Sequence, residues 1–140
     1  MELIRGLHNL RPQHRGCAAT IGNFDGVHLG HQAVLGQLSE RAADLHLPAT
    51  VITFEPQSRE YFQPASAPPR LTRFREKVEV LRRYGVDRVL CLRFNDTLAR
   101  LTADEFIRII LLDGLDVKYL VVGDDFRFGR ERCGYFSLLV

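Results

Sequence analysis

Four short runs of apolar residues along the chain have the length of β-strands. Each is apolar almost throughout, without the alternation of apolar and polar positions that a half-exposed strand shows. Continuous runs of this kind are typical of parallel strands that are covered on both faces. The four predicted strands are Cys17–Ile21, Ala49–Phe54, Arg88–Leu92 and Lys118–Val122.

Between these runs the apolar residues recur every three or four positions, which is the spacing of one helix face. The predicted helices are His31–Leu45, Arg73–Tyr84 and a segment that begins at Thr102 and ends at Gly114. Pro48 is expected to stop the first helix, and Thr72 and Gly85 are expected to cap the second. Thr102 and Glu105 have the spacing of a capping box at the start of the third helix.

Alternating strands and helices predict an α/β protein with a Rossmann-like parallel sheet and helices on both faces. A length of 140 residues with 46% hydrophobic residues suits one globular domain. The proline-rich stretch 63–69 is expected to form an exposed loop. An apolar element begins at Gly134 and stops at Val140. We therefore expect residues 1–140 to form a domain whose C-terminal part is missing.

Composition excludes several classes of partner. The formal net charge of +2 is too small to favour nucleic acid or an anionic membrane. Cys17, Cys91 and Cys133 are far apart and form no C-x-x-C pair, so neither a zinc site nor a disulfide framework is expected. The sequence has no signal-peptide pattern and no apolar run of the ~20 residues that a membrane span needs. A cytoplasmic protein is expected, of undetermined oligomeric state.

Charged residues alternate in sign along the second predicted helix. This alternation predicts a solvated helix face rather than an anion-binding surface. The basic residues are Arg70, just before this helix, and Arg73, Arg75, Lys77, Arg82 and Arg83 within it, and the acidic ones are Glu76 and Glu79.

A glycine-rich loop follows the first predicted strand and leads into the first predicted helix. Ligands of open α/β sheets bind at the carboxyl ends of the strands, and the free N–H groups of a helix start suit phosphate. Gly22, Gly26 and Gly30 permit close approach of the backbone to such a ligand. The loop has neither the G-x-x-x-x-G-K-[ST] nor the G-x-G-x-x-G pattern, which argues against a P-loop and against the usual dinucleotide fingerprint.

Two histidines, His28 and His31, mark the start of this helix. Residues three apart can lie on one helix face, so both imidazoles can reach one phosphate group. The H-x-G-H pattern of His28 to His31 resembles the signature of the nucleotidylyltransferase superfamily that class I aminoacyl-tRNA synthetases share.

Longer segments resemble one family in particular, the bacterial FAD synthetases. These are bifunctional proteins with an N-terminal FMN adenylyltransferase domain and a C-terminal riboflavin kinase domain. The segment Thr20–Gln32, T-I-G-N-F-D-G-V-H-L-G-H-Q, resembles the first family motif, and three more segments agree in order and interval. They are Thr53–Phe62, Arg70–Thr72 and Val121–Gly129.

The chain departs from the family pattern in two respects. Ser58 stands where the family usually has a proline in its second motif. The late Ser/Thr-rich motif with an arginine that helps to hold ATP phosphates does not occur, nor does the kinase domain. The resemblance therefore covers about the first three-quarters of an adenylyltransferase domain.

The resemblance implies the reaction FMN + ATP → FAD + pyrophosphate, with Mg²⁺ bound to ATP and no protein-bound metal. The FMN phosphate is the nucleophile, so the protein has to align two anions and offset their charge. The catalytic residues would be His28, His31 and Asp125. The ATP-binding residues would be Gly22, Asn23, Phe24, Asp25 and Gly30, and the flavin-binding residues Pro56, Phe62 and Phe128.

Two other hypotheses remain open. The acceptor would be another phosphate compound, such as a pantetheine or nicotinamide nucleotide. Alternatively, the chain would bind nucleotide or flavin, or only a partner protein, without catalysis. The aromatic segment 126–129 favours flavin over the other acceptors. The parent protein would also phosphorylate riboflavin, as the family does.

Overall fold

The computed structural model describes residues 1–22, 24, 29–55, 74–93, 98, 100–122, 127–128 and 134–135. In this part of the chain the main sheet has five parallel strands in the order β1-β4-β3-β2-β5. They are β1 (Glu2–Arg5), β2 (Cys17–Ile21), β3 (Ala49–Phe54), β4 (Arg88–Leu92) and β5 (Val117–Val121), and β6 (Arg127–Phe128) pairs antiparallel with β7 (Gly134–Tyr135). The predicted parallel α/β sheet is confirmed.

Three predicted strands have the observed bounds, while β5 begins and ends one residue before its prediction. The strand β1 was not predicted from the sequence. This strand lies at the edge of the sheet beside β4, and Ile4 is its one buried residue. A strand with one buried side chain lacks the apolar run that identified the other four.

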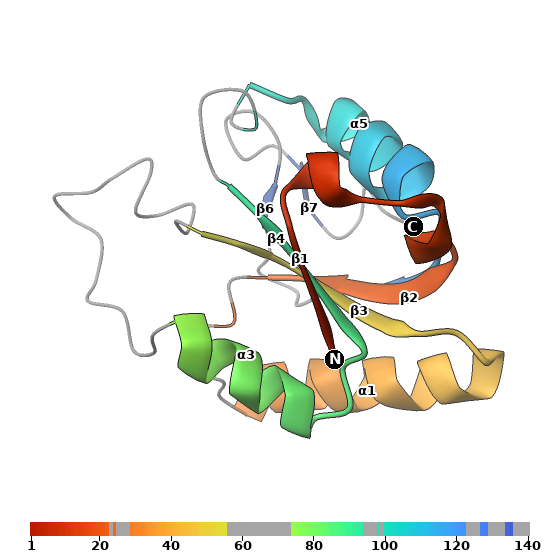
Figure 1. Cartoon of the computed structure of the whole chain (residues 1–140), viewed down its shortest axis with the longest axis vertical. Coiled ribbons are helices and arrows are strands. Elements are labelled where there is room, and N and C mark those ends of the chain that lie inside the picture. Colours follow the sequence, from red (N-terminus) through yellow and green to blue (C-terminus); the bar gives the residue numbers. More distant parts are fainter. Residues whose placement is uncertain are drawn as a thin grey trace, which may run out of the picture.

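Helices cover both faces of the sheet, as predicted (Figure 1). The helices α1 (Leu29–Leu45) and α3 (Phe74–Arg83) lie on one face. The other face carries α5 (Ala103–Phe106), its continuation η3 (Ile107–Gly114), and the short turns η1 (Leu7–Asn9) and η2 (Pro12–His14). No helix among the described residues is long and apolar enough to cross a membrane.

Two apolar clusters, one on each face, form the core. Along β2 the side chains alternate between them, because successive residues of a strand point to opposite faces. Ile21 packs with Phe106 and Ile110 on the α5 face, and Ala18 packs with Leu35 on the α1 face. The sheet is therefore buried on both sides, which explains why its central strands are apolar throughout.

The helices α1 and α3 end in the same geometry. At the end of α3, Gly85 has φ +84°, Val86 N donates to Leu81 O (3.3 Å) and Gly85 N donates to Arg82 O (3.1 Å). This is a Schellman motif, in which a left-handed residue satisfies the last carbonyl groups of a helix. The predicted role of Gly85 is confirmed. In α1 the left-handed residue is His46 (φ +56°), so this helix ends before Pro48 is reached.

The predicted capping box at Thr102 is also confirmed. Glu105 N donates to Thr102 Oγ1 (3.1 Å), and Thr102 N donates to Glu105 Oε1 (3.0 Å). Beyond Phe106 the helix widens to π geometry as far as Gly114, and Leu115 N donates to Ile110 O five residues back (3.1 Å). The apolar periodicity predicted a helix here but not its π form, which is rare.

Strand order reverses between β2 and β5. The chain runs outward from β2 through β3 to β4, and then crosses back to place β5 on the other side of β2. In sheets of this type, ligands bind at the carboxyl ends of the strands at such a switch point. The loop that follows β2 begins there.

Candidate functional site

The carboxyl edge of β2 is where the glycine-rich loop begins. Gly22 N donates to Ile52 O (3.0 Å), so the chain is still bonded to β3 as it leaves β2. A Cβ on Gly22 would lie 2.9 Å from Cε2 of Phe24. Since real Cβ atoms essentially never approach that closely, a side chain at this position would force the Phe24 ring to shift.

Phe24 folds back over the start of the loop. Its φ of +54° is uncommon for a residue with a bulky side chain, and its ring is 2% exposed within the α1-side core. Phe24 was predicted to bind ATP. Because its ring is buried in the core, the side chain has a structural role, and the backbone of Phe24 is the part that can contact ATP.

His31 lies in the first turn of α1, which begins at Leu29. Its imidazole is half-buried and its ring centroid is 5.0 Å from that of Phe24, with an angle of 50° between the planes. The predicted position of His31 at a helix start is confirmed. The first N–H groups of a helix have no partner within it, so His31 stands next to backbone donors that suit an anion.

Lys77 and Thr53 form a polar contact that sequence analysis missed. Lys77 Nζ donates to Thr53 Oγ1 (3.1 Å), and the two residues are 1% and 0% exposed. The prediction that Lys77 lies on a solvated face is wrong, although Arg75, Arg82 and Arg83 of the same helix are exposed. Lys77 is four residues before the buried Leu81. That spacing was the signal that could have placed it on the inner face.

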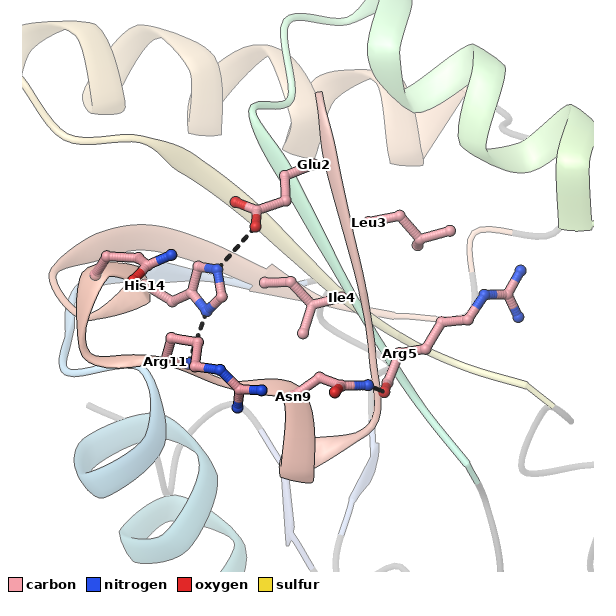
Figure 2. Close-up of a pocket in the computed structure, with 8 residues that line it drawn as sticks. Glu2, Leu3, Ile4, Arg5, Asn9, Arg11 and His14 are labelled. Atoms are coloured by element: carbon pink, nitrogen blue, oxygen red, sulfur yellow. Dashed lines mark hydrogen bonds and ion pairs between the residues drawn. The ribbon is translucent and has the colours of Figure 1, made fainter.

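A separate hollow of about 340 Å³ lies beside β1 and holds none of the predicted site residues (Figure 2). In it, His14 Nδ1 accepts from Arg11 N (2.9 Å), so Nε2 carries the hydrogen and donates to Glu2 Oε2 (2.9 Å). Arg88 Nε lies 3.4 Å from Glu2 Oε1. The His14 hydrogen bond, with a smaller contribution from Arg88, holds the pKa of the Glu2 carboxyl below its ordinary value. These contacts tie β1 to β4 and to η2.

Comparison with known proteins decides the family. The model of the family described as FAD synthetase matches residues 10–140. The chain belongs to the FAD synthetase family.

Several curated proteins resemble this FAD synthetase chain over 99% of its length. Three are named bifunctional riboflavin kinase/FMN adenylyltransferase. They come from Pseudomonas fluorescens (59% identical), Escherichia coli strain K12 (54%) and Haemophilus influenzae (52%). The chain spans 44–45% of the length of these relatives.

A solved structure shares the fold of this FAD synthetase chain. It is titled a macrolide-efflux protein from Streptococcus pneumoniae, with a TM-score of 0.83 and 26% identity, over 99% of this chain and 54% of that one. The likeness supports the Rossmann-like assignment of the sheet.

Most other predicted site residues of the FAD synthetase chain lie outside the described residues. They are His28, Asn23, Asp25, Asp125, Pro56 and Phe62. Gly30 lies in the first turn of α1, and the backbone of Phe128 lies in β6. The structure thus brings Gly22, Phe24, Gly30 and His31 together at the end of β2.

Proposed function

We propose that this chain transfers the adenylyl group of ATP to FMN, giving FAD and pyrophosphate. The observation that carries the proposal is the FAD synthetase family match over residues 10–140. The 52–59% identity to proteins named bifunctional riboflavin kinase/FMN adenylyltransferase supports the choice of acceptor. A glycine loop and a histidine at the switch point of a parallel sheet are compatible with a nucleotide site.

In this reaction an oxygen of the FMN phosphate attacks the α-phosphorus of ATP. The bond from that phosphorus to the bridging oxygen breaks, and pyrophosphate leaves with the electron pair. No side chain has to act as nucleophile. The task of the protein is to align two anions and to stabilise the charge that develops on the leaving group.

We assign that stabilisation to His28 and His31. The Phe24 ring, itself held in the core, packs against the His31 imidazole and restricts its motion (5.0 Å between centroids). A donor that is held in place before reaction stabilises developing charge without reorganisation. The backbone of Gly22–Asp25 and the start of α1 at Gly30 would bind ATP.

The flavin would lie against Pro56, Phe62 and Phe128, because apolar and aromatic faces suit a planar heterocycle. Pro56 and Phe62 come after β3, whose carboxyl end adjoins that of β2. A flavin there would place its phosphate close to the glycine loop.

Mg²⁺ is proposed to arrive with ATP. It prefers oxygen ligands and is usually held by one or two carboxylates together with nucleotide phosphates. His31 offers nitrogen, so of the proposed catalytic residues Asp125 has the side chain that suits this ion. When bound, Mg²⁺ would neutralise phosphate charge.

The full-length protein is proposed to phosphorylate riboflavin as well, since its relatives are named for both activities. That second activity would require residues beyond the 44–45% of the relatives that this chain matches.

The test is FAD formation by the protein at its full natural length, with MgATP and equal concentrations of FMN, phosphopantetheine and nicotinamide mononucleotide. We expect FAD as the adenylylated product. Failure of FMN to react while another acceptor does would move the chain to a different substrate. Tight binding of ATP and FMN without any product would make it a binding protein instead.

A further inference from the structure

Lys77 is a buried ammonium at the carboxyl edge of the sheet. Lysine is almost never fully buried, because removing a charge from water is costly unless polar partners surround it. Lys77 is 1% exposed, and its Nζ donates to the hydroxyl of Thr53. Lys118, the other lysine of the chain, has a side chain that is 55% exposed and contacts Asp116. Lys77 is therefore held among protein groups, in contrast to the solvated Lys118.

The register of the sheet places this ammonium next to the glycine loop. The last recorded pair between β2 and β3 is Ile21 with Ile52, so Gly22 and Thr53 are neighbours one step further on. Ile21 and Ile52 point to the α5 face. Because side chains alternate along a strand, Gly22 and Thr53 point to the other face.

That face is the one that α1 and α3 cover (Figure 1), and Phe24 belongs to its core cluster. Phe24 lies over Gly22 and against His31. Lys77 therefore reaches, through Thr53, the same side of the loop on which His31 stands.

In the hydrogen bond between Lys77 and Thr53, the chemistry of the two groups fixes which one donates. An ammonium has donors only, so the Thr53 oxygen must accept, and its own hydrogen has to point to a different acceptor. A charged donor also strengthens the hydrogen bond that the hydroxyl makes in turn. The Lys77–Thr53 pair thus places a positive charge and a polarised hydroxyl at this edge of the sheet.

A second cation lies near the first. The Arg5 guanidinium lies 5.0 Å and Lys77 Nζ 5.7 Å from the centroid of the Phe74 ring. Arg5 ends β1, so it too belongs to the carboxyl edge of the sheet. Phe74 attracts both cations and offsets part of their mutual repulsion. Positive charge is thereby collected at the edge where the substrates of the proposed reaction would carry their phosphates.

We propose that Lys77 is a positioning residue for the phosphate groups of the bound nucleotides, acting through the Thr53 hydroxyl and through its own charge. The inference rests on the proposed adenylyl transfer. It assigns to α3 a part in recognition that the glycine loop and the two histidines do not supply.

The test compares Lys77→Met with Lys77→Arg in the protein at its full natural length. Initial rates of FAD formation give KM for ATP and for FMN, and competitive inhibition of the same reaction gives Ki for adenosine and for lumiflavin, which lack phosphate. We expect Lys77→Met to raise KM for ATP, FMN or both by roughly tenfold or more, with both Ki values unchanged. The KM that rises, for ATP or for FMN, shows which nucleotide carries the phosphate that Lys77 positions. Lys77→Arg keeps the charge and should recover most of the affinity.

Lys118→Met is the matched control and should change none of these constants. If Lys77→Met does not fold, Thr53→Val against Thr53→Ser decides, with the increase in KM expected for valine alone. Equal weakening of phosphate-bearing and phosphate-free ligands, equal loss with methionine and arginine, or no change at all would overturn the role of Lys77. If the unaltered protein forms no FAD, the proposed function itself is rejected, and this inference with it.

Discussion

Phe24 is the residue on which the described part of the site depends. Its ring fills the space over Gly22, enters the α1-side core and contacts His31. The types of residue in the loop were enough to predict a phosphate site at a strand end. They did not predict the buried ring, because that position follows from a left-handed backbone (φ +54°) that aromatic residues seldom adopt. Lys77 was wrongly predicted to be solvated. The alternation of charges along α3 was given more weight than the four-residue spacing between Lys77 and the buried Leu81.

Gly22→Ala tests the close packing of this loop. The added methyl group meets the Phe24 ring at 2.9 Å, so we expect a loss of about 1–3 kcal/mol in the free energy of unfolding. Gly36→Ala is the matched control, because it lies within α1 with nothing within 4 Å of the new Cβ. That change should stabilise by up to about 1 kcal/mol. Urea unfolding measures both, and equal effects would contradict the packing argument.

His31→Ala tests the assigned stabilisation of the leaving pyrophosphate. Loss of one pre-positioned donor to the ATP phosphates should lower kcat/KM for FAD formation by roughly 10²–10³-fold, and His28→Ala should behave alike. His8→Ala, an exposed histidine on η1, should leave the rate unchanged. A full rate for the His31 and His28 variants would remove both residues from the mechanism.

At the scale of elements, neighbouring residues were enough to predict the ends of helices, whereas the edge strand β1 was not predicted. The Thr102 box and the Gly85 terminus are set by a few neighbouring residues, so the sequence identifies them. The strand β1 is held instead by distant partners, among them the Glu2 contacts with His14 and Arg88. These contacts are polar and join residues that are separated in the sequence, so a search for apolar runs does not detect them.

Thr102→Ala should cost about 1 kcal/mol in the free energy of unfolding, because the Thr102 side chain accepts the Glu105 N–H at the helix start. Thr102→Ser keeps the oxygen and should be close to neutral. Thermal unfolding of the three proteins at one pH is sufficient. Equal melting temperatures for the alanine variant and the wild type would show that the capping box contributes little.

The Glu2 contacts predict a pH dependence. The pKa of the folded Glu2 carboxyl is lower than its ordinary value of 4.5, so the ionised form stabilises the fold. This stabilisation is complete above the ordinary pKa and is lost as the pH falls through the lower folded pKa. The stability advantage of the wild type over Glu2→Gln should therefore shrink from pH 6 towards pH 3. Urea midpoints across that range measure it, and a constant difference would contradict the prediction.

At the scale of the whole molecule, alternation of strands and helices predicted a parallel sheet but not its order. The order β1-β4-β3-β2-β5 depends on the side to which each crossover turns, and residue periodicity does not encode that choice. The consequence for function is large. This order puts β5 beside β2, so that the chain leaves β5 next to the start of the glycine loop.

Such a site couples ligand binding to the stability of the whole sheet, because it joins strands from both halves of the chain. Ligands that bind the folded state alone stabilise it by RT ln(1 + [L]/Kd), which is about 2.7 kcal/mol at a hundredfold excess over Kd. We expect MgATP and FMN each to raise the melting temperature of the protein, whereas sulfate at equal ionic strength should not. His31→Ala should reduce the shift caused by MgATP more than that caused by FMN, because His31 is assigned to the ATP phosphates. Equal shifts for the variant and the wild type would show that His31 does not contribute to the binding of the ATP phosphates.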